Sequence, residues 1–145
     1  MVVTLLGSAV SWRSKLQSVV ATSTCHAEYI AAFECGREVV WLRMLLEDIG
    51  FDLSGPSPVL EDNAAVKWMA ESVGISDANK HIRVKYHWVR QCIEKKLLNL
   101  VTVASKENPA DCLTKSPTLQ SLNVMMVKSG LKTIAVDDHG DQGGC

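Results

Sequence analysis

The chain has 145 residues, about the size of one domain. Apolar residues make up 47% and charged residues 21%, which predicts a folded core rather than a disordered chain. The net charge of −1 excludes a uniformly basic protein, and no run approaches the roughly 20 apolar residues of a membrane span. Five cysteines without a Cys-x-x-Cys pair favour free thiols, so we expect an intracellular protein, cytoplasmic or nuclear, with no membrane partner.

The first 22 residues carry short β-prone stretches. Two of them, 2–6 and 9–12, flank a Gly-Ser pair, and a third at 17–22 has two valines at its centre. This pattern predicts an antiparallel hairpin or a three-stranded meander. Ser23 and Thr24 then have side chains suited to capping a helix.

The middle of the chain predicts alternating helices and strands. The evidence is the spacing of apolar residues, three or four positions apart in the longer segments, and β-prone runs bounded by turn residues. The expected elements are a helix over 25–49, a strand over 58–61, a short helix over 63–71, a helix over 81–96 and a strand over 97–103.

The last third predicts two more helices. Asn108 can cap a brief helix with Pro109 at its first position, and a second helix runs from about Pro117 to Gly130. Residues 132–145 are rich in Gly and Asp, so we expect a disordered tail behind a domain of residues 1–131. The alternation predicts an α/β fold with a mixed sheet.

Three acidic motifs stand where a helix is expected to begin or a strand to end. They are Ala27-Glu28-Tyr29, Glu61-Asp62-Asn63 and Ala110-Asp111-Cys112. Carboxylates brought together from such ends provide the hard oxygen ligands that divalent cations prefer. Two cations held a few ångströms apart can assist hydrolysis of a phosphodiester. Taken singly, each acid is better explained as a helix cap or a solvated side chain.

A basic strip lies on the helix expected over 81–96. Within 80–96 there are six Lys and Arg residues against one acid, Glu94. A local strip of this kind can follow nucleic-acid phosphates even when the whole chain is near neutrality. The alternative is an ordinary solvated helix face.

Six segments, in this order and spacing, resemble the ribonuclease H (RNase H) domain of copia-type retrotransposon polyproteins. The resemblance covers nearly all of residues 2–131. The segments are 7–15, 27–32, 41–43, 61–65, 80–90 and 108–115.

This resemblance implies a five-stranded mixed sheet with helices on both faces. It implies cleavage of the RNA strand of an RNA–DNA hybrid, with Mg²⁺ (or Mn²⁺) as the cofactor. By position, Glu28, Asp62 and Asp111 correspond to catalytic, metal-binding carboxylates. We expect Glu28 in the first turn of its helix and Asp62 at the end of a central strand.

The resemblance also indicates contacts with the hybrid. Lys80, His81, Arg83 and Asn63 are the candidates, since they lie in segments near the family's substrate side. For the three residues of the basic strip, a helix start on a solvated surface is an equally good interpretation.

The family's first strand, which is central and carries a further catalytic Asp, has no counterpart in this sequence. We therefore expect an open position in the sheet, which a reverse transcriptase domain or another chain would fill. As an isolated chain, the protein should have weak activity or none. The alternatives are a catalytically dead module that binds nucleic acid or protein, and a pseudogene fragment.

Overall fold

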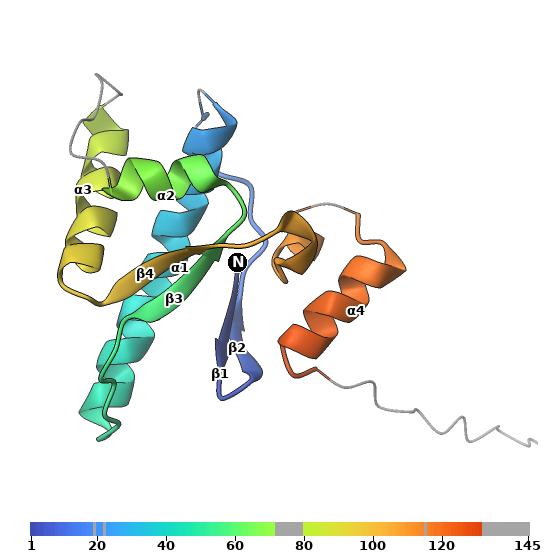
Figure 1. Cartoon of the computed structure of the whole chain (residues 1–145), viewed down its shortest axis with the longest axis horizontal. Helices are drawn as coiled ribbons and strands as arrows, with labels where there is room; N and C mark the ends of the chain where they lie inside the picture. Colours follow the sequence, from blue (N-terminus) through green and yellow to red (C-terminus); the bar gives the residue numbers. More distant parts are fainter. Residues whose placement is uncertain (19, 22, 72–79, 115, 132–145) are drawn as a thin grey trace, which may run out of the picture.

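The computed structural model describes residues 1–18, 20–21, 23–71, 80–114 and 116–131. Within these ranges it contains α-helices and two separate two-stranded sheets (Figure 1). The α/β class expected from the sequence is confirmed. No helix in the described ranges is long and apolar enough to cross a membrane. The tail expected over 132–145 lies outside the described residues.

The N-terminal hairpin pairs β1 (Val2–Leu5) with β2 (Ser8–Trp12) in antiparallel register. Leu6 and Gly7 form its two-residue turn with φ angles of 52° and 80°. Two positive φ angles match the twist of the strands, which is why such turns close hairpins well.

The third strand expected over 17–22 is absent from the described part of that segment. The outer edge of β2 is already used, because Ala9 N–H donates to the carbonyl of Ser129 at 2.8 Å. The Gln17 side chain instead donates to the carbonyl of Ala27 at 2.8 Å, which ties the segment to the next helix.

The long helix α1 (Thr24–Asp48) lies within one residue of its expected bounds at each end. Ser23 caps it, since its hydroxyl accepts a hydrogen bond from His26 N–H at 3.2 Å. One face of α1 packs on α3 (Lys80–Glu94), where the rings of Tyr29 and Tyr86 are buried with centroids 3.9 Å apart. Another face of α1 packs on both sheets.

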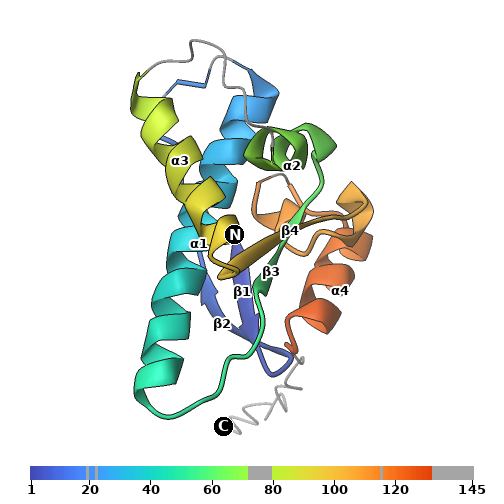
Figure 2. The same ribbon diagram turned by 60° about the vertical axis from the view of Figure 1, so that its left-hand side comes forward.

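The second sheet pairs β3 (Ser57–Glu61) with β4 (Leu98–Thr102) in parallel, with Val59 opposite Leu100. Between these strands the chain forms α2 (Ala64–Glu71) and α3. Helices α1, α2 and α3 gather around this sheet (Figure 2). The core is made of the apolar side chains that these elements share, among them Val59, Val66, Val89, Leu98 and Leu100.

The last third differs from expectation at Asn108. Its side-chain oxygen accepts from Ala110 N–H at 3.1 Å, which closes a local turn instead of capping a helix. The brief helix is a single 3₁₀ turn at Asp111–Leu113. The final helix, α4 (Leu119–Lys128), is capped by Thr118 and lies across the hairpin from α1 (Figure 1).

In the described ranges β1 and β3 do not pair, so the expected single mixed sheet is instead an antiparallel pair and a parallel pair. Both pairs pack on α1, which holds them as two parts of one layer.

Arg43 joins α1 to the loop that leads into β3. It is buried, and its guanidinium donates to the carbonyls of Gly55 at 2.7 Å and Leu53 at 3.0 Å and to the Ser57 hydroxyl at 2.9 Å. A buried guanidinium that satisfies three acceptors fixes the loop, and with it the start of β3.

We predict that Arg43→Met lowers the free energy of unfolding by about 2 kcal/mol, because three acceptors lose a charged donor. Urea denaturation followed by circular dichroism would measure the change. Arg37→Met is the matched control, since Arg37 lies on the same helix with its side chain 60% exposed. Equal midpoints for the two variants would contradict the assignment of Arg43 as the clamp.

Candidate metal centre

The end of β3 carries two acidic side chains in sequence. Strand alternation places Val59 and Glu61 on the face that packs against the helices, and both are buried. Asp62 follows the last residue of the strand and is half-buried. Glu61 is only 5% exposed, which is unusual for a carboxylate.

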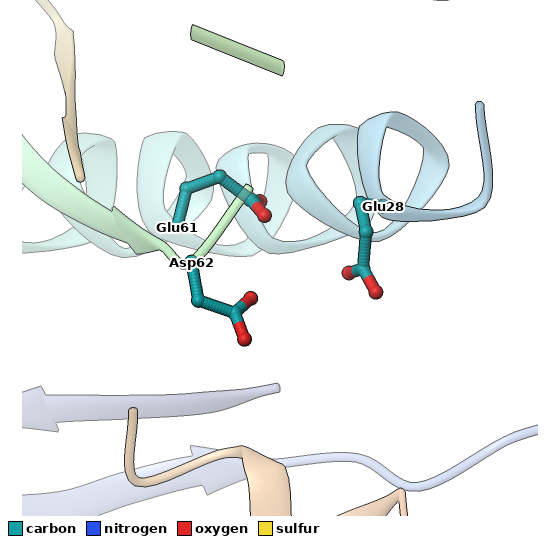
Figure 3. Close-up of side chains that lie close together, drawn as sticks. All are labelled: Glu28, Glu61 and Asp62. Carbon is teal, nitrogen blue, oxygen red and sulfur yellow. The ribbon is translucent and has the colours of Figure 1, made fainter. Parts of the chain in front are cut away.

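Glu28 approaches this pair from α1. The sequence predicted Glu28 in the first turn of the helix. It is the fifth residue of α1, so it lies just beyond that turn. One carboxylate oxygen from each of Glu28, Glu61 and Asp62 can be chosen so that all three lie within 4.8 Å of one another. Figure 3 shows Glu61 and Asp62 leaving the end of β3, with Glu28 projecting from the helix beside them.

Burial raises the pKa of Glu61 to about 7, and the negative charges of Glu28 and Asp62 push it in the same direction. A hydrogen bond from Asn63 N–H to the Glu61 carboxylate, at 3.1 Å, partly opposes this rise. Three carboxylates so close together repel when ionised, and a bound cation relieves that repulsion. Their hard oxygen atoms fit Mg²⁺ or Mn²⁺.

Asp111, the third carboxylate expected at the site, lies outside this cluster. It begins the 3₁₀ turn Asp111–Leu113 and lines the same cavity as Glu28 and Asp62, a space of about 610 Å³. The cavity is bounded by β1, α1, β3 and the 108–114 segment. The fold therefore brings Glu28 and Asp62 together and leaves Asp111 outside the cluster, on the wall of the same cavity.

The residues expected to contact nucleic acid differ in their exposure, and two of them have side chains that the structure does not describe. Asn63 is half-buried, and its side-chain oxygen accepts from Ala65 N–H at 3.0 Å, so it caps α2. Arg83 is exposed on α3. The side chains of Lys80 and His81 lie outside the described part of the structure.

Sequence reasoning missed Glu61 as a member of the cluster. A signal was available, because Glu61 follows Val59 by two positions in a predicted strand, and alternate residues share a face. A carboxylate on the core-facing side of a strand is a candidate functional group, since burial of an isolated charge is unfavourable.

Comparison with known proteins shows the family to which the chain belongs. The chain is homologous to a region of copia-type retrotransposon Pol polyproteins. Over 112 residues it is 40% identical to the retrovirus-related Pol polyprotein from transposon TNT 1-94 of Nicotiana tabacum, which covers 77% of this chain and 8% of that protein.

Two similar proteins from Arabidopsis thaliana extend this finding. The Pol polyproteins from transposons RE2 and RE1 are 32% and 31% identical over 106 residues, which is 73% of this chain and 7% of each relative. The chain thus spans less than a tenth of the length of these relatives. No family model and no solved structure matches it.

We predict that Glu61→Gln stabilises the cation-free protein at pH 8. The raised pKa means that the folded state holds the Glu61 proton more tightly than the unfolded state. Wild-type stability should therefore be fully present below the unfolded pKa and fall as the pH rises through about 7, a loss on the order of 2 kcal/mol.

Thermal unfolding in EDTA at pH 5 and pH 8 checks this prediction. Glu61→Gln should melt at a higher temperature than wild type at pH 8, and the gap should shrink at pH 5. Glu34→Gln, on the more exposed side of α1, is the control and should show no such pH-dependent gain. An equal difference in melting temperature between Glu61→Gln and wild type at both pH values would contradict the argument that burial raises the pKa of Glu61.

Proposed function

We propose that the chain is a retrotransposon-derived, RNase H-like domain whose acidic site hydrolyses the RNA strand of RNA–DNA hybrids with bound divalent cations. In this proposal the isolated chain has weak activity or none. The observation that carries it is the meeting of Glu28 and Asp62. Sequence motifs far apart in the chain marked these two acids, and the fold brings their carboxylates within 4.8 Å.

The position of the cluster supports the proposal. Ligands of open α/β sheets bind at the carboxyl ends of parallel strands, and Asp62 directly follows β3 there. Glu28 is on α1, which packs against β3, so this packing sets its position relative to the strand. The chain is also homologous to proteins described as retrovirus-related Pol polyproteins of transposons, which is consistent with a nucleic-acid substrate.

In the proposed reaction, Glu28 and Asp62 would hold the cations at the end of β3, where both residues line the cavity. Bound cations would supply Lewis-acid stabilisation of the phosphate charge. Glu61 belongs to the same cluster, and its buried carboxylate would be ionised beside a bound cation. Arg83 is available on the surface of α3 for a backbone phosphate of the hybrid, together with Lys80, His81 and Asn63 as further proposed contacts.

The weakness of the isolated chain follows from the same geometry. Asp111 lies outside the group of carboxylates that can share one ion, so we expect it to add little to cation binding at the cluster. Loss of a single electrostatic group at a catalytic site commonly lowers the rate by about 10²-fold or more. This arrangement also favours a second candidate function, a module that binds nucleic acid or protein without cleaving.

We expect Mn²⁺ binding to depend on the cluster. Isothermal titration should give at least tenfold weaker binding for Glu28→Gln and for Asp62→Asn than for wild type, since each removes an anionic ligand. Glu34→Gln is the matched control on α1 and should bind as wild type does. If all four proteins bind Mn²⁺ equally, the cluster is not the cation site.

Cleavage tests the activity directly. RNA release from a labelled RNA–DNA hybrid, in Mg²⁺ or Mn²⁺, should be slow or undetectable, and any release should disappear in Asp62→Asn. Rapid cleavage abolished by that substitution would contradict the predicted weakness. Mn²⁺ binding at the cluster with no cleavage by a folded sample would favour the binding module, and absence of both would overturn the proposed function.

A further inference from the structure

The carboxyl-terminal half of α1 has an exposed apolar stripe on one face. Trp41, Met44 and Leu45 are 57%, 60% and 43% exposed, whereas Val39 and Arg43 on the opposite face are buried. The three apolar residues are three and four positions apart, so they are neighbours on the helix surface. This end of α1 extends beyond the start of β3 (Figure 1). A contiguous group of large apolar side chains in water marks a candidate interaction surface.

Opposite charges mark the two ends of this stripe. Arg37 lies four residues before Trp41, and Asp48 lies four residues after Met44, and both charged residues are exposed. The intervals along the stripe are therefore four, three and four residues, which is the period of about 3.5 along the seam of two packed helices. Arg37 is 3.7 Å from Glu34 of its own helix, but its side chain is 60% exposed. A guanidinium has five N–H donors, so it can pair with a second carboxylate as well.

This order of charges makes the stripe complementary to a second copy of itself in one orientation. A parallel copy would set Arg37 against Arg37 and Asp48 against Asp48, and like charges placed opposite each other are unfavourable. An antiparallel copy centred between Trp41 and Met44 sets Arg37 of each helix opposite Asp48 of the other. The same register places Trp41 of each helix opposite Met44 of the other. Each contact is therefore made twice, as a two-fold symmetric interface requires.

An open hollow at the amino end of the stripe fits the same register. It has a volume of about 370 Å³ and is lined by Arg13, Glu34, Arg37, Glu38 and Trp41. In the antiparallel register, residues 49–51 of one copy lie over residues 34–37 of the other. Two of those residues, Ile49 and Phe51, are 63% and 53% exposed. An aromatic ring placed beside the two guanidinium groups of the hollow makes a favourable contact.

We propose that two copies of this chain associate through the carboxyl-terminal halves of their α1 helices, as an antiparallel, two-fold symmetric pair. Trp41 and Met44 form its centre, and tryptophan is enriched among the residues that dominate binding energy. The surface is small, near the lower limit of about 1,200 Å² for stable interfaces, so the association should be weak and reversible. Trp41 lies about 20 Å along the helix from Glu28, and the inference does not rest on the proposed function.

Sedimentation equilibrium of the full chain measures this self-association. We expect a shift from monomer to dimer between about 1 and 100 μM, the range of a small, transient interface. Arg37→Asp and Asp48→Arg should each weaken dimerisation at least tenfold, because each variant sets like charges opposite one another at both ends of the pair. The samples contain EDTA, so the result is independent of cation binding at the acidic cluster. Single variants that dimerise as tightly as wild type would contradict the antiparallel pairing.

Mixing the two single variants should restore association. In a pair made of one Arg37→Asp copy and one Asp48→Arg copy, opposite charges face each other at both ends. The double variant with both substitutions should also dimerise as wild type does, because exchanging the two charges preserves every pair in the antiparallel register. If the mixture and the double variant stay monomeric while wild type dimerises, the assigned charge pairing is wrong.

A substitution at the centre of the stripe localises the interface. Met44→Lys should abolish dimerisation, since it places a charge in the apolar seam, and the exposure of Met44 means that the fold should survive. Val84→Lys is the matched control, because Val84 is an apolar residue of α3 that is 69% exposed, and it should dimerise as wild type does. Circular dichroism confirms that both variants are folded. A dimer that survives Met44→Lys would contradict the assigned surface. A folded wild-type chain that stays monomeric at about 100 μM would overturn the inference and leave the stripe to a different partner.

Discussion

Packing of α1 against both sheets is the constraint on which the structure depends. One face of the helix contacts both β1 and β3, although these strands do not pair in the described ranges. Polar contacts reinforce the hairpin side, since Ser11 of β2 donates to the Glu38 carboxylate at 2.8 Å. On the other side Arg43 holds the loop before β3. Without this common support Glu28 and Asp62 would not meet, because one belongs to the helix and the other to the strand end.

Local signals predicted most of the elements because each depends on neighbouring residues. Ser23 and Gly50 mark the ends of α1, and apolar spacing marks its interior, so its bounds were predicted to within one residue. The strand expected over 17–22 was wrong in its described part, because a strand also needs a free edge and β2 gives its edge to Ser129. The β-propensity of a segment does not show whether a distant residue already occupies the strand edge that the segment would need.

The candidate site also combines local features, which the sequence predicts, with distances that depend on distant residues. Glu28 and Asp62 could be named from motifs and from strand and helix ends, whereas the distance that joins them requires the packing of α1 on β3. Asp111 was placed by its motif near the same end of the sheet, and the fold puts it in the shared cavity but beyond the cluster. Its position is set by a 3₁₀ turn and by the Asn108 turn before it, neither of which has a strong sequence signal.

Glu61 links the stability of the chain to its chemistry. A buried carboxylate next to two others destabilises the cation-free fold, and that energy becomes available to bind a cation. The burial of Glu61 keeps water away from one side of this cluster. Lower local polarity strengthens the attraction between the carboxylates and a cation. Cation binding should therefore stabilise the fold most at a pH above about 7, where Glu61 would otherwise be ionised without a partner cation.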